Sequence, residues 1–155
     1  MSKTIWVLNG PNMNLLGERE PEKYGTMTLA QLDDSLLKAG TLINLMVHFY
    51  QNNHEGALID QIHKIRHEAH GMIINPGAFG HTSIALRDAL AAFPHPIIEV
   101  HLTNVFKREE YRHHSFVSEV AVGVISGMGT YGYHLALKAM AQHLSTDSPF
   151  CFYET

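Results

Sequence analysis

The chain of 155 residues is long enough for one domain with a proper buried core, and no repeat, low-complexity tract or linker divides residues 1–155. Hydrophobic residues make up 45% and charged residues 17%, which is typical of a soluble globular chain and excludes a disordered or membrane-spanning one. The net charge of −4, without a basic stripe, argues against a nucleic-acid partner.

The start of the chain and its cysteine content favour a cytoplasmic protein. Met1 leads directly into a strand-like run, without the charged segment, apolar stretch and cleavage site of a secretory signal. Cys151 is the single cysteine, so it has no partner for an internal disulfide and fits a reducing compartment.

Hydrophobic periodicity predicts strands that alternate with helices along the chain. Apolar runs predict strands at residues 4–8, 45–50, 72–75, 96–102 and 120–126. Helical spacing predicts one helix that begins at a Thr28–Gln31 capping box, and others at about 55–70, 82–92 and 131–144. Nearly all-apolar strands that alternate with helices imply an α/β fold with a parallel sheet covered on both faces. Five strands at this length resemble the flavodoxin-like doubly wound order.

The connection between the first strand and the first helix, residues 10–27, is long and has no periodicity. It carries Arg19 and Tyr24 between two glycines. Long structureless connections are uncommon in compact domains and are often active-site lids. Residues 17–26 are therefore a candidate lid, with a disordered surface loop as the alternative.

The most informative stretch is residues 99–112. Glu99 and His101 lie on the same alternation of a predicted strand, so their side chains share one face. A carboxylate beside a histidine fixes its tautomer and supports its protonated form, which suits a general acid. Arg108 and Arg112 have i, i+4 spacing, so one helical turn would aim both guanidinium groups into the same space. The alternative is a satisfied core histidine with surface arginines.

Three polar loops follow three of the predicted strands, at residues 9–14, 75–81 and 101–112. In doubly wound sheets, ligands bind beyond the carboxyl ends of the strands. The convergence of these loops at one edge therefore favours an enzyme.

The twelve histidines suggest a metal site, but the residue spacing does not support one. Neither a His-Glu-x-x-His nor a Cys-x-x-Cys pattern occurs. His63, His67 and His70 have i, i+4, i+7 spacing in the predicted helix 55–70, which favours a solvated helix face over a ligand set. We expect no metal.

Residues 127–132 read Gly-Met-Gly-Thr-Tyr-Gly and match a dinucleotide-binding fingerprint, with Glu154 as a possible acidic partner. Too little chain follows this turn for the βαβ unit that presents the ribose contact. The glycines are better explained by a tight turn and close packing of helix on sheet, so no nucleotide cofactor is expected.

Several motifs together resemble those of type II 3-dehydroquinate dehydratase. They are Asn9-Gly10-Pro11-Asn12-Met13-Asn14-Leu15-Leu16-Gly17, Arg19-Glu20-Pro21, Tyr24-Gly25, Asn53-His54-Glu55-Gly56, Asn75-Pro76-Gly77-Ala78-Phe79, His81-Thr82-Ser83 and Glu99-Val100-His101-Leu102. The resemblance covers residues 9–137 in register. The departures are Met13 and Met128, where other aliphatic residues are usual, and Thr103, where serine is common.

The resemblance implies a flavodoxin-like enzyme without a cofactor that dehydrates 3-dehydroquinate to 3-dehydroshikimate in the shikimate pathway. It implies that Tyr24 is the base and that Arg19 is the lid residue that stabilises the charged transition state. His101 would protonate the departing hydroxyl, oriented by Glu99, and Asn12 would hold a water against the developing enolate.

The resemblance also implies the substrate contacts and the assembly. The substrate hydroxyls and carboxylate would bind to Asn75, His81, Arg112 and the backbone of Leu102 and Thr103. A neighbouring subunit would supply Asp88, because the family assembles as trimers grouped into a dodecamer.

The implied chemistry agrees with elementary acid–base reasoning. Loss of water β to a ketone needs a base at the α-carbon, stabilisation of the enolate and an acid at the leaving oxygen. A free tyrosine is ionised in roughly one molecule in 1,000 at pH 7. A cation within about 4–6 Å stabilises the ionised form of an acidic group, which explains why Arg19 and Arg108 would accompany Tyr24.

The sequence gives less support to two alternatives, a Schiff-base mechanism and a non-enzymatic binding function. A lysine Schiff base would give the same product, but every lysine falls on a predicted helix, terminus or exposed loop, where desolvation is slight. A non-enzymatic binder of a small anion would need the arginines, but not the pairing of Glu99 with His101 or the placing of Tyr24 in a lid.

Overall fold

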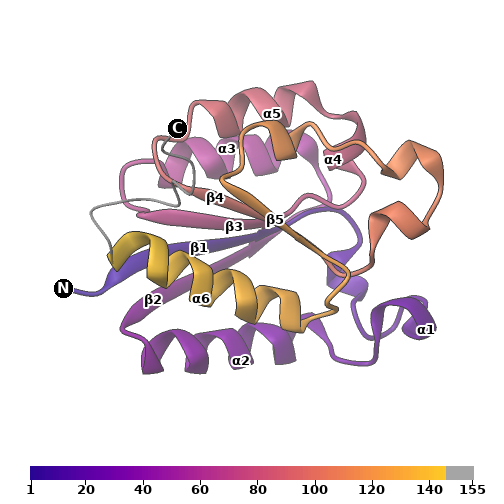
Figure 1. The fold of residues 1–155 in the computed structure, drawn as a ribbon. Coiled ribbons are helices and arrows are strands. Elements are labelled where there is room, and N and C mark those ends of the chain that lie inside the picture. Colours follow the sequence, from indigo (N-terminus) through magenta and orange to yellow (C-terminus); the bar gives the residue numbers. More distant parts are fainter. Residues whose placement is uncertain (146–155) are drawn as a thin grey trace, which may run out of the picture.

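The computed structural model describes residues 1–145 and contains one five-stranded parallel sheet between two layers of helices (Figure 1). The sheet order is β2-β1-β3-β4-β5, and every neighbouring pair is parallel. This is the flavodoxin-like doubly wound order, so the predicted fold class is confirmed. The strands are β1 (Lys3–Asn9), β2 (Leu45–Gln51), β3 (Gly71–Asn75), β4 (Ile97–His101) and β5 (Gly123–Ser126).

Helices cover both faces of the sheet (Figure 1). One layer consists of α2 (Leu29–Leu42) and α6 (Tyr131–Ser145), and the other of α3 (Glu55–Ile65) and α5 (Ile84–Ala91). Each layer has its own hydrophobic core, because successive strand side chains point to opposite faces. On β3, for example, Ile73 belongs to the core under α2 and α6, and Ile74 to the core under α3 and α5.

Helix α2 begins at the predicted capping box. The Thr28 hydroxyl accepts a hydrogen bond from the backbone N–H of Gln31 at 3.2 Å. The Gln31 side chain in turn accepts one from the backbone N–H of Thr28 at 3.0 Å. Two N–H groups that the helix leaves unpaired are thus satisfied, and the prediction is confirmed.

Two predicted helices differ from the structure. The helix predicted at 55–70 ends at Ile65, and the chain leaves it before His70, whose Nδ1 accepts a hydrogen bond from the backbone N–H of Thr4 at 3.0 Å. The three spaced histidines therefore do not share a helix face. The helix predicted at 82–92 is found as α5 at Ile84–Ala91, because Ser83 has an extended backbone and caps this helix by accepting from Leu86 N at 2.9 Å. The short α4 (Phe79–Thr82) precedes Ser83.

The lack of periodicity at residues 10–27 suggested a structureless connection, but the structure shows short helices there. The connection contains the 3₁₀ helix η1 (Met13–Leu15) and the single-turn α1 (Pro21–Tyr24), both too short to produce a periodic pattern. Gly17 has a φ of +89°, and a Cβ there would lie 2.8 Å from the carbonyl oxygen of Thr26. The two ends of the segment 17–26, which we call the lid, therefore meet, and they do so at a position that requires glycine.

The glycine-rich turn after β5 has a structural use. Gly127 has a φ of +92°, and a Cβ there would lie 3.0 Å from the Asn104 side chain. The turn leads into α6, in agreement with the tight-turn explanation. Glu154, the acidic residue of the alternative, and Cys151 lie outside the described residues.

Within residues 1–145, no helix is long and apolar enough to cross a membrane. The same part of the chain has no group of three or more His, Cys, Asp or Glu side chains arranged to hold a metal ion.

Candidate active site

A cavity of about 260 Å³ lies where the polar loops meet, next to the carboxyl ends of β3 and β4. All the predicted site residues except Glu99 and Asp88 line it. The lining residues are Pro11, Asn12, Met13, Arg19, Tyr24, Asn75, Gly77, Ala78, His81, His101, Leu102, Thr103, Val105, Arg108 and Arg112. The sheet therefore brings together side chains from three loops far apart in the sequence, as the parallel topology predicts.

The end of β4 provides a buried acid–base pair. Glu99 and His101 are 1% and 7% exposed, and His101 Nε2–H donates to Glu99 Oε2 at 2.5 Å. Because Nε2 is engaged by the carboxylate, Nδ1 is the ring nitrogen left for a substrate oxygen.

Two serines that sequence reasoning missed hold the Glu99 carboxylate in place. Ser115 Oγ donates to Oε1 at 3.0 Å, and Ser118 Oγ donates to the carboxylate at 3.1 Å. Ser115 lies in the irregular segment between η3 (Glu110–Arg112) and η4 (Val117–Glu119), and Ser118 lies within η4, so neither is marked by a periodic pattern. Together with His101, they satisfy a carboxylate that is otherwise removed from water.

His81 packs beside His101 with nearly parallel rings, 6.2 Å between centroids and 18° between planes. Its Nδ1–H donates to the carbonyl of His114 at 2.7 Å. Burial lowers the pKa of His81, although the hydrogen bond to His114 works in the opposite direction. His81 is therefore suited to act as a neutral imidazole, with Nε2 as an acceptor for a substrate hydroxyl.

Tyr24, the last residue of α1, is half-buried and lies between two guanidinium groups. The Cζ atoms of Arg19 and Arg108 lie 5.4 Å and 5.7 Å from the centre of its ring. One arginine comes from the lid, and the other follows η2 (Val105–Lys107). Both guanidinium groups are therefore within cation–π distance of the ring.

Arg108 and Arg112 reach the cavity, but not from the single helical turn that was predicted. Arg108 is extended and separates η2 from η3 (Glu110–Arg112). The Glu109 carboxylate connects the two arginines, at 2.8 Å from Arg112 Nε and 3.7 Å from Arg108 Nε. Its pKa falls to about 2, because its own backbone N–H and Arg112 donate to it. Sequence reasoning missed Glu109, although its i, i+3 spacing from Arg112 was a signal that could have found it.

The first loop is fixed at Asn12 by an unusual backbone conformation. Asn12 has a φ of +69°, and its N–H donates to Asn53 Oδ1 at 2.9 Å. The same oxygen accepts from Gln51 Nε2 at 3.1 Å, which ties the loop to the end of β2. Asn53 belongs to a motif noted in the sequence, and its role here is to support Asn12.

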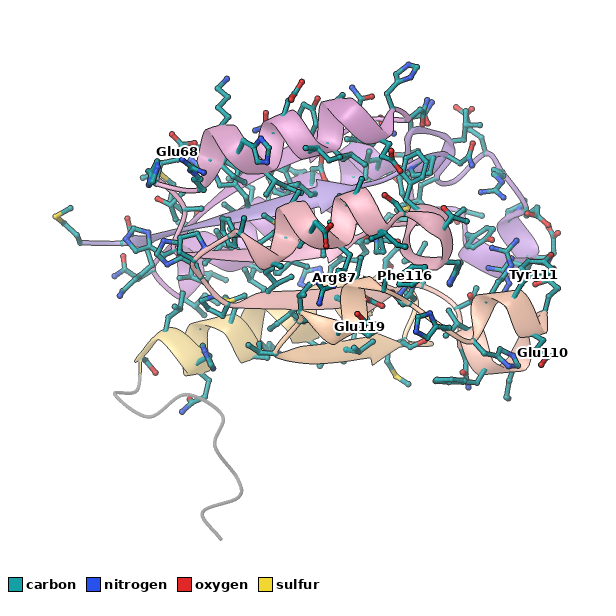
Figure 2. The ribbon with its side chains drawn as sticks, turned by 90° about the horizontal axis from the view of Figure 1, so that it is seen from above. Glu68, Arg87, Glu110, Tyr111, Phe116 and Glu119 are labelled. Atoms are coloured by element: carbon teal, nitrogen blue, oxygen red, sulfur yellow. The ribbon has the colours of Figure 1, made fainter. Side chains whose placement is uncertain are left out.

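The remaining predicted residues differ in their placement. Leu102 and Thr103 directly follow β4, and Thr103 Oγ1 accepts from Arg108 at 3.3 Å. Asp88 lies on α5, exposed and paired with Arg87 at 3.1 Å, and it does not line the cavity of its own chain. Arg87 also reaches Glu119 of η4 at 3.3 Å, so this ion pair connects α5 with η4 (Figure 2).

The fold and the cavity thus define an acid–base site on a flavodoxin-like sheet, with a buried imidazole and a phenol flanked by cations. A model of the dehydroquinase class II family matches residues 3–141. The chain belongs to this family.

Individual relatives cover nearly the whole chain. "3-Dehydroquinate dehydratase 2" of Pseudomonas aeruginosa is 53% identical over 142 residues, 92% of this chain and 96% of that protein. "Catabolic 3-dehydroquinase" of Phaeosphaeria nodorum is 48% identical, over 93% of this chain and 95% of that protein. The crystal structure of the type II dehydroquinase of Propionibacterium acnes superimposes with a TM-score of 0.89 at 44% identity, covering 92% of this chain and 98% of that one.

Proposed function

We propose that this protein dehydrates 3-dehydroquinate to 3-dehydroshikimate by a cofactor-free anti elimination through an enolate. The observation that carries the proposal is that a phenol between two arginines and a buried imidazole–carboxylate pair line one small cavity. The family membership of the chain and the names of its relatives support the same substrate.

Tyr24 is the base in this proposal and removes the proton α to the ketone. Arg19 and Arg108 stabilise the phenolate before the transfer and the negative charge that then moves onto the substrate. Asn12 holds a water molecule against the enolate oxygen, and its anchored left-handed backbone supports a fixed position for its side chain.

His101 is the acid and gives a proton to the hydroxyl that leaves. The Glu99 carboxylate stabilises the imidazolium form and aims the ring, while the serines that donate to Glu99 limit its movement. Base and acid come from separate elements, the lid and the end of β4, which suits removal of the two groups from opposite sides of the substrate.

The other lining residues bind the substrate. Arg112 and the backbone of Leu102 and Thr103 take the carboxylate, because a guanidinium fork matches its geometry. Asn75 and His81 bind the hydroxyls, with the imidazole of His81 as an acceptor. Neither a metal nor a nucleotide takes part.

We also propose that the active protein is a dodecamer of four trimers in the cytoplasm, in which Asp88 of one chain completes the site of the next. The exposure of Asp88 on α5, away from its own cavity, supports this arrangement. The reaction belongs to the shikimate pathway and aromatic amino acid biosynthesis, while the name of the Phaeosphaeria nodorum relative refers to a catabolic enzyme.

The direct test is the appearance of the enone absorbance of dehydroshikimate when dehydroquinate is added to the purified protein. The protein is first dialysed against a chelator, and turnover is expected to be unchanged, because the proposed chemistry needs no metal. Treatment with borohydride in the presence of substrate is also expected to leave activity intact, because no lysine Schiff base forms. Absence of the enone signal from a folded protein would refute the proposed activity.

A further inference from the structure

A buried polar network connects the floor of the candidate site to α6. Asn9 and Asn75 are register partners at the carboxyl ends of β1 and β3, so their side chains point to the same face of the sheet. Tyr133, in the first turn of α6, packs on that face and is fully buried. Its hydroxyl donates to Asn9 Oδ1 at 2.5 Å and accepts from Asn75 Nδ2 at 3.0 Å. The proposed mechanism does not use Tyr133.

Burial keeps the Tyr133 hydroxyl neutral, because desolvation raises its pKa well above the ordinary value. A neutral phenol has one hydroxyl hydrogen, and here it is donated in the hydrogen bond to Asn9 Oδ1. Asn75 must therefore present its nitrogen, and not its oxygen, to the tyrosine. A second contact fixes the same orientation independently, because Asn75 Oδ1 accepts from the backbone N–H of Gly77 at 3.1 Å.

Hydrogen bonds thus hold both the oxygen and the nitrogen of the Asn75 amide, and only the second N–H of Nδ2 has a weak partner. Nδ2 also lies 3.5 Å from the Met13 sulfur, a weak acceptor that lines the cavity as Asn75 itself does. A substrate oxygen in the cavity is a better acceptor than a thioether and would replace it.

We propose that Tyr133 is a positioning residue for substrate binding, whose hydroxyl holds the Asn75 amide with one N–H directed at a substrate hydroxyl. This inference rests on the proposed dehydratase function and adds to it a residue outside the cavity. Its physical basis is that an amide already held in the binding orientation loses little conformational freedom when the substrate arrives.

The test is Tyr133→Phe, which removes one oxygen and leaves the ring that packs in the core. Nδ2 of Asn75 then loses its strong acceptor and the amide is held only by Gly77, so KM for dehydroquinate should rise about five- to tenfold, the worth of one hydrogen bond. The value of kcat should change less than about twofold, because Tyr24 and His101 are untouched. Tyr131→Phe, the same change at an exposed position two residues earlier, is the matched control and should leave both constants unchanged.

A double-mutant cycle with Asn75→Ala separates positioning from general loosening of the fold. If Tyr133 acts through Asn75, Tyr133→Phe should have almost no further effect on KM in the Asn75→Ala background. An equal rise in KM in both backgrounds would show that the hydroxyl only stabilises the fold, and would overturn the proposal. So would an unchanged KM in the single variant.

If Tyr133→Phe does not fold, Asn9→Ala provides a second route to the same answer. This change removes the oxygen that accepts the hydrogen bond from the Tyr133 hydroxyl. The hydroxyl hydrogen can then turn toward Asn75 and repel the N–H that its amide presents. KM should again rise about fivefold, and an unchanged KM would count against the proposal. An inactive wild-type protein would refute the proposed function and this inference together, whereas an active one with unaltered KM in these variants refutes only the role of Tyr133.

Discussion

The two halves of the proposed catalytic pair are built in opposite ways. Glu99 and His101 lie at the buried end of a central strand, and the carboxylate accepts hydrogen bonds from His101, Ser115 and Ser118. Tyr24 lies half-exposed at the end of a four-residue helix in the lid, where its described neighbours include Arg19 and Arg108.

This difference suits the two tasks. An acid that protonates a leaving hydroxyl must be aimed, and hydrogen bonds aim a ring more strictly than charge does. A base needs its negative form stabilised, and nearby guanidinium groups supply that without fixing a single geometry. In the proposed mechanism, the buried end of β4 therefore sets direction, and Arg19 of the lid together with Arg108 sets charge.

The largest effect is expected for Tyr24→Phe, which removes only the base oxygen. Turnover should fall about 10²–10⁴-fold, because base catalysis is worth that much. Substrate affinity and the unfolding midpoint should remain close to those of the wild type, since the side chain is only half-buried. Steady-state kinetics and a thermal melt measure both, and activity above about a tenth of wild type would refute the assignment of the base.

His101→Ala should separate the two halves of the reaction. Dehydration should fall by about 10²–10⁴-fold, while exchange of the substrate α-hydrogen with solvent continues, because Tyr24 remains in place. NMR of the substrate in deuterated water follows the exchange, and Tyr24→Phe is the matched control that should lose it. If exchange and dehydration disappear together in His101→Ala, His101 has a wider role than protonation of the leaving group.

Removing the serines tests whether direction at β4 depends on them. Ser115→Ala combined with Ser118→Ala should lower kcat about tenfold with little change in KM, because hydrogen bonds to a charged group are worth about 1.5–3 kcal/mol and water replaces part of that. Ser145→Ala, at the exposed end of α6, is the control. A double variant with wild-type kcat would mean that the strand alone aims the pair.

Asp88 tests whether a third region, on a neighbouring chain, completes the site. Tyr24→Phe and Asp88→Ala subunits, each weak alone, should recover activity when they are assembled together. With equal random mixing, about one site in four would combine an intact Tyr24 with an intact Asp88 from the neighbour. Mixed oligomers, verified by mass, that show no more than the average of the two parents would exclude a shared site.

The smallest effect concerns Asp33 on α2, a carboxylate without the donors that Glu99 has. Among residues 1–145, its Oδ1 has no hydrogen-bond partner, and burial raises its pKa from 3.8 to about 6. The folded state therefore binds more protons than the unfolded state between these values, so stability falls as the pH rises through this window.

Asp33→Asn removes the ionisable group and should raise the free energy of unfolding at pH 7 by about 1 kcal/mol. The gain is smaller than full burial would give, because the side chain is only half-buried. The gain should disappear below about pH 4, where Asp33 is protonated in both states. Urea unfolding at about pH 3 and pH 7 measures it. Asp34→Asn, which removes an exposed ion pair with Lys38, should not stabilise the protein at either pH.

Local pattern by itself determined the architecture of this protein. Buried residues recur every second position in a strand and every three to four in a helix, so the apolar pattern identifies strands that alternate with helices. This alternation in turn predicts a parallel sheet. The pairing of Glu99 with His101 was likewise readable, because residues two apart on a strand share a face. The helix end at Ile65 was missed, and the start of α5 at Ile84 depends on the capping contact of Ser83, which apolar periodicity does not locate.

Only the tertiary structure decided which groups form hydrogen bonds with the polar residues of the candidate site. Ser118 lies 19 positions from Glu99, and Tyr133 lies 58 positions from Asn75 and 124 from Asn9. No periodicity links positions so far apart, since their meeting depends on where each loop crosses the edge of the sheet. A hydrogen bond acts only within about 3 Å and along one direction, so the partner of a polar side chain is settled only when the whole chain has folded.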